Sequence, residues 1–225
     1  MRLAGADLML SPTDLSNFLS CRHRTALELS EVAGERKRPR WDDPLLEILW
    51  QRGLEHERAY VESLRGDGVV IADLSALKDA GPALAATLRA MQDRADVIVQ
   101  GALADEQWNG RPDVLRRVET PSGLGAWSYE AVDTKLARET RAGTILQLGL
   151  YSEMLRTAQG LLPECFYVVT PSQDESVQRY RTEDYAAYLR WIRTQLRQTV
   201  MQEADAVAAA HYPEPVDHCD ICAWV

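Results

Sequence analysis

The sequence predicts an α/β protein with a mixed β-sheet, in which a central antiparallel hairpin is flanked by helices. The main observation is the stretch from Gly110 to Lys135. It reads as two strands joined by a turn at Thr120–Gly125, which is rich in Pro, Ser and Gly. Helical patterns precede and follow this hairpin, and short apolar strands lie on either side of it. With 225 residues, 46% of them apolar, the chain suits one large α/β domain.

Composition and charge exclude several classes of protein. No stretch approaches the roughly 20 apolar residues of a membrane span, and the N-terminal residues do not form a secretory signal. We therefore expect a cytoplasmic protein with no membrane partner. A formal charge of −9 argues against a protein that only coats nucleic acid, although a local basic region still allows an enzyme that acts on it. The most basic region contains Arg22, Arg24, Arg36, Lys37, Arg38 and Arg40.

The first helix is predicted to begin at Ser11-Pro12, with serine as the N-cap and proline at the first helical position. An apolar stripe through Leu15 and Phe18 continues it, and Cys21 follows at its end. The polar stretch 31–43 reads as a surface loop.

A second, longer helix is predicted from Asp43-Pro44 to about Leu64, with Leu49, Gly53, His56 and Tyr60 on one stripe. Gly53 is expected to let another backbone or a ligand approach beside His56. A lone histidine on such a stripe is most often an ordinary core residue. His56 therefore becomes a ligand candidate only if the carboxylate-bearing hairpin packs against this helix.

The rest of the chain supplies most of the predicted sheet and the helices that cover it. Residues 96–135 are expected to form a three-stranded antiparallel meander. The other predicted elements are a strand at 68–73, a helix at 75–93, a helix at 143–159, a covered strand at 164–170 that contains Cys165, an edge strand at 177–181 and a helix capped by Thr182.

The central hairpin gathers charged side chains that a purely structural role does not explain. With the turn centred near Gly123, Asp113 and Asp133 become cross-strand neighbours, whose Cβ atoms are expected about 5 Å apart. Side chains alternate along a strand, so Lys135 falls on the same face as Asp133. Paired carboxylates repel unless a cation lies between them, and this pattern therefore predicts a metal site.

The order Pro-Asp, about twenty residues, then Asp-x-Lys resembles the core of the PD-(D/E)XK nucleases. Further stretches resemble the RecB- and AddB-type members in the same order: SPTDLSNFLSC, RGLEHE, GRPDVL, YEAVDTK and QLGLY. This resemblance implies a restriction-endonuclease-like core and a single RecB-like nuclease domain over residues 1–225. It also implies a longer bacterial protein, in which a helicase or ribonuclease-H-like domain follows.

The same resemblance implies that His56, Asp113, Asp133 and the Thr134 carbonyl bind Mg²⁺ or Mn²⁺, cations suited by such ligands. Lys135 would position the attacking water or stabilise charge in the transition state. Gln147 and Tyr151 would hold the lysine and the nucleic-acid backbone in place. The implied reaction is phosphodiester hydrolysis in DNA, at single strands or ends. A non-catalytic nucleic-acid-binding or helicase-associated module of the same fold is the alternative, although this chain keeps every metal ligand and the lysine.

The resemblance also assigns Cys21, Cys219 and Cys222 to a [4Fe–4S] cluster that joins the two ends of the domain. The related nucleases use a fourth cysteine that this chain lacks, so residues 211–225 read as a truncated cysteine-bearing tail. Cys165 is expected in the core instead. Half of a zinc ribbon is another interpretation of Cys219-x-x-Cys222, but it requires a second cysteine pair nearby.

Overall fold

The computed structural model describes residues 1–5, 7–39, 44–66, 68–171, 176–212 and 215–224. Its helices are α1 (Pro12–Ser20), α2 (Arg22–Val32), α3 (Pro44–Ser63), α4 (Ala80–Gln92), α5 (Ala142–Gln159), α6 (Thr182–Val200), α7 (Ala204–Ala210) and the 3₁₀ helix η1 (Asp217–Ile221). Its strands are β1 (Arg2–Ala4), β2 (Asp7–Met9), β3 (Ile71–Asp73), β4 (Val97–Val99), β5 (Leu103–Asp105), β6 (Trp108–Gly110), β7 (Val114–Val118), β8 (Ser128–Thr134), β9 (Cys165–Val169) and β10 (Val177–Arg181).

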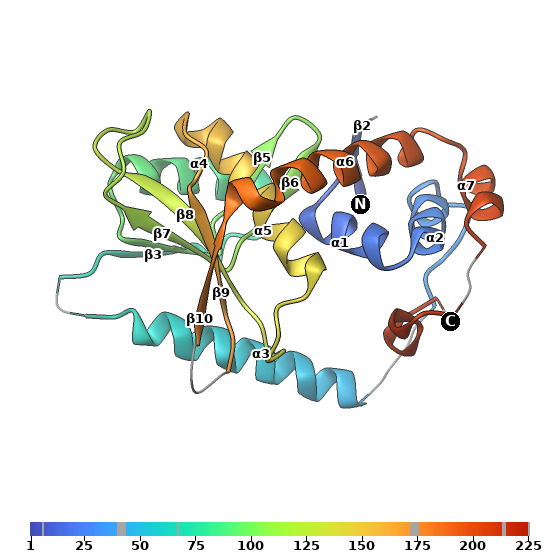
Figure 1. Cartoon of the computed structure of the whole chain (residues 1–225), viewed down its shortest axis with the longest axis horizontal. Coiled ribbons are helices and arrows are strands. Elements are labelled where there is room, and N and C mark those ends of the chain that lie inside the picture. Colours follow the sequence, from blue (N-terminus) through green and yellow to red (C-terminus); the bar gives the residue numbers. More distant parts are fainter. Residues whose placement is uncertain (6, 40–43, 67, 172–175, 213–214, 225) are drawn as a thin grey trace.

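Six of the described strands form one mixed sheet in the order β10-β9-β8-β7-β4-β3. The pairs β8–β9 and β3–β4 are parallel, and the others are antiparallel. Strand β10 lies at an edge, as its sequence predicts. Helices flank the sheet (Figure 1), and the predicted α/β class with a mixed sheet is confirmed.

The central hairpin has the predicted register. Val114 pairs with Val132 and Val118 with Ser128, so the turn is centred on Gly123. The meander prediction needs one correction. Strand β4 does pair with β7, but Leu103–Asp105 and Trp108–Gly110 leave the main sheet and pair with each other as a separate two-stranded sheet. The first hairpin strand therefore begins at Val114 rather than at Gly110.

Two apolar layers cover the two faces of the sheet. The larger layer joins α1, α4, α5 and α6 to sheet residues such as Leu115, Ala131 and Phe166. The smaller layer is a cluster of valines, including Val99, Val114 and Val132, against which α3 packs through Val61. In Figure 1, α3 runs along the bottom of the view, below α1, α2 and α6.

Helix α3 has the predicted extent within the described residues, but its apolar stripe is buried only toward its C-terminal end. Ile48, Leu49 and Trp50 near its start are exposed, whereas Val61 is 8% exposed. The prediction that Gly53 lets another part of the backbone approach is wrong, because a Cβ added there would meet no atom within 4 Å. Asp43, the predicted start of the helix, lies outside the described residues.

The N-terminal helices and the C-terminal tail lie together. Ser11 and Asp14 form a capping box at the start of α1, which confirms the predicted boundary. The sequence pattern missed α2, which begins directly after Cys21 and packs against α7.

At α6 the N-cap is Arg181 rather than Thr182, which is the first helical residue. Among the described residues, no helix is long and apolar enough to cross a membrane.

Candidate active site

The candidate site lies where several strands begin or end at one end of the main sheet. Asp113 immediately precedes β7, and Asp133 and Lys135 lie at the end of β8. Gln100 follows β4, and its backbone N–H donates a 2.8 Å hydrogen bond to the Asp113 carbonyl. The hairpin register places Asp113 opposite Asp133, one pair beyond Val114 and Val132.

The Asp113 carboxylate is held through both of its oxygens. Its Oδ2 accepts hydrogen bonds from the Thr134 backbone N–H at 2.7 Å and from Thr134 Oγ1 at 2.9 Å. Its Oδ1 lies 3.4 Å from Gln100 Nε2, which donates to it. These contacts join the two hairpin strands to the end of β4 and restrain the orientation of the carboxylate.

Asp133 is 6% exposed, which is an expensive position for an ionised carboxylate. Burial, with the nearby Asp113 charge as a second cause, raises the pKa of Asp133 to about 7. Lys135 Nζ forms an ion pair with Asp133 Oδ2 and opposes this shift. The same Oδ2 is buried and makes no hydrogen bond of good geometry among the described residues. A cation that binds this oxygen would therefore have to displace the Lys135 ammonium or share the oxygen with it.

Lys135 is anchored by its backbone, whose N–H donates to the Val169 carbonyl at 2.8 Å. Its ammonium group is partly buried, which by itself would lower its pKa. The carboxylates of Asp133, Asp113 and Glu57 outweigh this effect, so the pKa of Lys135 is raised overall. Lys135 is therefore a cation at neutral pH, held against the carboxylates.

Helix α3 brings two further side chains to the site. His56 is half-buried, and its Nε2 lies 3.3 Å from the Val169 carbonyl, the acceptor that Lys135 N–H also uses. His56 therefore faces the sheet, beside the end of β8. Glu57 Oε1 accepts a 2.6 Å hydrogen bond from Gln100 Nε2. Burial and then the Asp113 charge raise the pKa of Glu57.

Glu57 and Gln100 are site residues that the sequence analysis missed. Glu57 ends the stretch RGLEHE, so its position next to His56 was the available signal. Gln100 has a left-handed backbone, with φ of +52°, which is uncommon for residues other than glycine. A single sequence carries no local pattern for such a conformation.

Helix α5 supplies Gln147 and Tyr151. Tyr151 is 8% exposed, and its ring lies against Gly110, where an added Cβ would approach Tyr151 Cε1 to 2.8 Å. Burial, followed by the charges of Asp133 and Asp113, raises the pKa of Tyr151. Gln147 is half-buried one turn earlier, and within the described ranges it makes no hydrogen bond to Lys135. Tyr151 thus lies within electrostatic reach of the carboxylates.

The donors at this end of the sheet suit a hard divalent cation. They are the carboxylate oxygens of Asp113 and Asp133 and the nearby imidazole of His56. Of these oxygens, Asp133 Oδ2 makes no hydrogen bond of good geometry within the described residues. In the described part of the chain, no three His, Cys, Asp or Glu side chains are already gathered in ligating geometry. Instead, Thr134 binds Asp113 and Lys135 pairs with Asp133.

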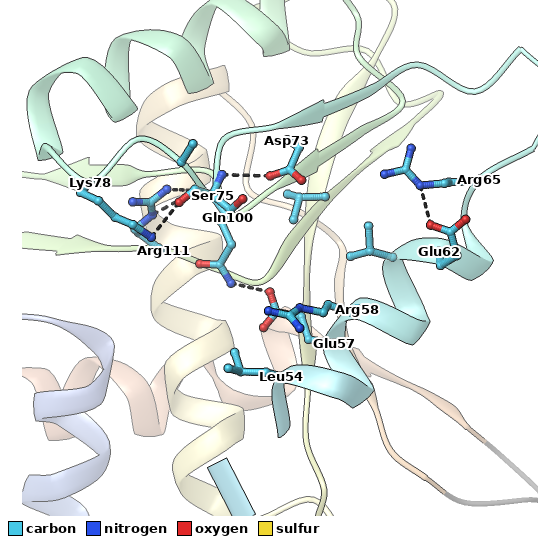
Figure 2. Close-up of a pocket in the computed structure, with 13 residues that line it drawn as sticks. Leu54, Glu57, Arg58, Glu62, Arg65, Asp73, Ser75, Lys78, Gln100 and Arg111 are labelled. Carbon is cyan, nitrogen blue, oxygen red and sulfur yellow. Dashed lines mark hydrogen bonds and ion pairs between the residues drawn. The ribbon is translucent and has the colours of Figure 1, made fainter. Parts of the chain in front are cut away.

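A cleft of about 810 Å³ opens beside the carboxylates and shares Glu57 and Gln100 with them. Helix α3 forms one wall, and the segment from Asp73 to Lys78 faces it (Figure 2). Arg111 holds that segment in place by donating hydrogen bonds to the carbonyls of Leu77, Leu74 and Gln100. Arg111 therefore fixes the wall of the cleft that faces α3.

The cysteines are separate from this site. Cys165 is fully buried on β9, as predicted, and burial raises its pKa. Cys21 lies between α1 and α2, and Cys219 and Cys222 lie in and directly after η1. All are free thiols. The residues near them are in contact: the His23 and Tyr212 rings lie 5.8 Å apart, and Arg38 lies 5.6 Å from the Trp224 ring.

Comparison with known proteins adds no assignment: no protein-family model matches the chain, and no curated protein matches it.

Proposed function

We propose that this chain is a metal-dependent nuclease that hydrolyses phosphodiester bonds in DNA, at single strands or ends, on a restriction-endonuclease-like core of the RecB type. The observation that carries the proposal is the arrangement of Asp113, Asp133 and Lys135. Two carboxylates lie opposite each other in the hairpin register, and the lysine pairs with the more deeply buried one. A cation site next to a fixed ammonium group suits chemistry on a phosphodiester.

Asp113, Asp133, His56 and the Thr134 carbonyl would hold Mg²⁺ or Mn²⁺. The bound cation would act as a Lewis acid on the phosphodiester and lower the pKa of a bound water. Lys135 supplies positive charge where negative charge develops on the phosphate, and it orients the water. Gln100 and Thr134 keep the Asp113 carboxylate oriented in the absence of substrate. By the resemblance, Tyr151 and Gln147 on α5 would orient the lysine and the DNA backbone once substrate is bound.

The proposal is tested by incubating a labelled single-stranded oligonucleotide with the protein in Mg²⁺, Mn²⁺ or EDTA. Asp113→Asn, Asp133→Asn and Lys135→Met are each expected to reduce cleavage by a factor of about 10² to 10³ or more, because each removes charge stabilisation of the transition state. EDTA is expected to abolish cleavage by the wild-type protein.

Two exposed substitutions serve as matched controls. Asp93→Asn at the end of α4 and Arg89→Met on the same helix remove a carboxylate and a cation from exposed positions away from the site, and full activity is expected. Thermal melting of all five variants separates lost chemistry from lost folding. Undiminished cleavage by folded Lys135→Met, or no metal-dependent cleavage by the wild-type protein, would refute the proposal.

We also propose that Cys21, Cys219 and Cys222 contribute to a [4Fe–4S] cluster in a longer protein that carries a helicase or ribonuclease-H-like domain. The cluster rests on the sequence resemblance, since the described cysteines form no ligand group here. The contacts of His23 with Tyr212 and of Arg38 with Trp224 support it, because they hold the tail against the helix that Cys21 precedes.

A further inference from the structure

The cleft beside the carboxylates differs in charge from the chain as a whole. Its lining contains four cations and three carboxylates, whereas the whole chain has a formal charge of −9. The cations are Arg58, Arg65, Lys78 and Arg111. The lining therefore carries a net charge of +1 (four cations minus three carboxylates), which favours an anionic ligand there over the rest of this acidic surface.

Two of these cations face each other across the cleft and are available to a ligand. Arg58 projects from α3, is exposed and makes no ion pair within the described residues (Figure 2). Lys78 is also exposed, and within the described residues its Nζ donates one hydrogen bond, to the Ser75 carbonyl at 2.8 Å. Arg65, just beyond the end of α3, forms an exposed ion pair with Glu62, and such pairs are weak. The Arg111 guanidinium already donates hydrogen bonds to backbone carbonyls, so it supports the wall of the cleft.

The carboxylates of the cleft already accept hydrogen bonds, or they lie where the cleft meets the candidate active site. Asp73 accepts a 3.0 Å hydrogen bond from the Ser75 backbone N–H. Hydrogen bonding by the Ser75 side chain, and then by this backbone group, lowers the pKa of Asp73. Glu57 bonds to Gln100, where the cleft meets Asp113. Arg58 follows Glu57 on α3 and lies beside it, whereas Lys78 lies on the segment that faces this helix (Figure 2).

The size and lining of the cleft indicate whether it can hold a single strand or a duplex of nucleic acid. A volume of about 810 Å³ falls within the range of about 300–1,000 Å³ that is typical of sites for small ligands. Such a cleft admits a few nucleotides of a single strand but not a duplex. None of the described lining residues is aromatic, so bases cannot stack there. Recognition would therefore act on phosphates and be independent of sequence.

We infer that this cleft binds the single-stranded segment of nucleic acid next to the scissile phosphate, with Arg58 and Lys78 contacting its backbone from opposite walls. The inference deepens the proposed function, since it places the substrate strand at the site that the nuclease would use. The apolar side chains of Leu54, Val61 and Ala76 supply the surface against which the sugars rest.

The test measures binding of a fluorescent oligothymidylate by anisotropy in EDTA, where no cleavage occurs, at several salt concentrations. The double variant Arg58→Ala/Lys78→Ala is expected to bind about tenfold or more weakly than the wild-type protein. Its slope of log K against log salt is expected to be shallower by about 1.4, because each lost phosphate contact on a single strand contributes about 0.7. The matched duplex is expected to bind less tightly than the single strand.

Arg89→Ala/Arg190→Ala is the control, because it removes the same charge from exposed positions outside the cleft. It is expected to retain the binding and salt slope of the wild-type protein, and both double variants are expected to melt as the wild type does. Equal behaviour of the two double variants, tighter binding of the duplex, or no measurable binding by the wild-type protein would overturn the inference.

The two proposals fail in distinguishable ways. One outcome is binding in EDTA that depends on the cleft, with no cleavage in Mg²⁺ or Mn²⁺. This outcome would refute the proposed nuclease activity and leave the binding cleft in place. Metal-dependent cleavage that is lost in Lys135→Met, but with binding unaffected by Arg58→Ala/Lys78→Ala, would refute only the cleft.

Discussion

Asp133 makes the stability of the metal-free protein depend on pH. Its pKa is raised to about 7 in the folded protein, chiefly by burial, whereas an exposed aspartate titrates near 3.8. Between these values the folded state binds more protons than the unfolded state, so the free energy of unfolding falls as pH rises. One group can contribute at most about 1.4 kcal/mol per pH unit. Urea unfolding in EDTA from pH 4 to 8 is expected to show this loss.

The Asp133→Asn variant should separate this residue from the other carboxylates. Its amide cannot ionise, so its unfolding free energy should fall less steeply with pH than that of the wild-type protein. The remaining slope reflects groups such as Glu57, whose pKa is also raised. Identical slopes for the two proteins would contradict the assignment of the buried charge to Asp133.

Gln100 combines a strained backbone with a side chain that bridges Glu57 and Asp113. Gln100→Gly removes the side chain but relieves the positive φ, so stability should be kept or improved, whereas Gln100→Ala should be destabilised. Both variants lose the support of Asp113. Partners of this kind affect metal affinity by about 10- to 100-fold, and calorimetric titration with Mn²⁺ is expected to show weaker binding for both. Wild-type Mn²⁺ affinity in Gln100→Gly would assign the bridge a structural role only.

At the scale of elements, α3 sets the position of His56 and Glu57, and only its C-terminal half is buried against the sheet. Val61→Ala removes two methyl groups from the valine cluster and is expected to cost about 1–3 kcal/mol of unfolding free energy. Ile48→Ala on the same helix is the control, because Ile48 is 50% exposed, and little change is expected. Chemical denaturation measures both.

Hydrogen exchange should locate the effect of Val61→Ala. Because the valine cluster is the main apolar contact of α3, faster exchange is expected in α3 before it appears in α5. Uniformly faster exchange throughout the sheet would instead mean that α3 opens only with global unfolding.

At the scale of the whole molecule, α7 and the tail pack against α2 and the loop after it, so the C-terminal segment lies beside the N-terminal helices. Three thiolates cannot fill the four cysteine positions of a [4Fe–4S] cluster. The 225-residue chain is therefore expected to bind iron poorly. In the longer protein that we propose, a chain extended through the next cysteine is expected to be brown and more stable, and Cys21→Ser should remove the colour. Metal analysis that finds zinc, or colour retained in Cys21→Ser, would contradict the cluster.

The sequence by itself determined the features that depend on neighbouring residues or on one turn. The hairpin register follows from the turn around Gly123 and from side-chain alternation, so the opposition of Asp113 and Asp133 and the position of Lys135 were predictable. The start of α1 follows from Ser11 and Pro12, whose capping geometry is local. A single sequence, without structure, was enough to identify these.

Only the tertiary structure decided the features that join distant segments. The pairing of β8 with β9, the contact of His56 with Val169 and the bridge from Glu57 through Gln100 to Asp113 connect segments separated by tens of residues. The cleft depends in addition on Arg111, which ties the segment before α4 to the end of β4. Such contacts arise when apolar layers pack and buried polar groups find partners, and no local pattern encodes them.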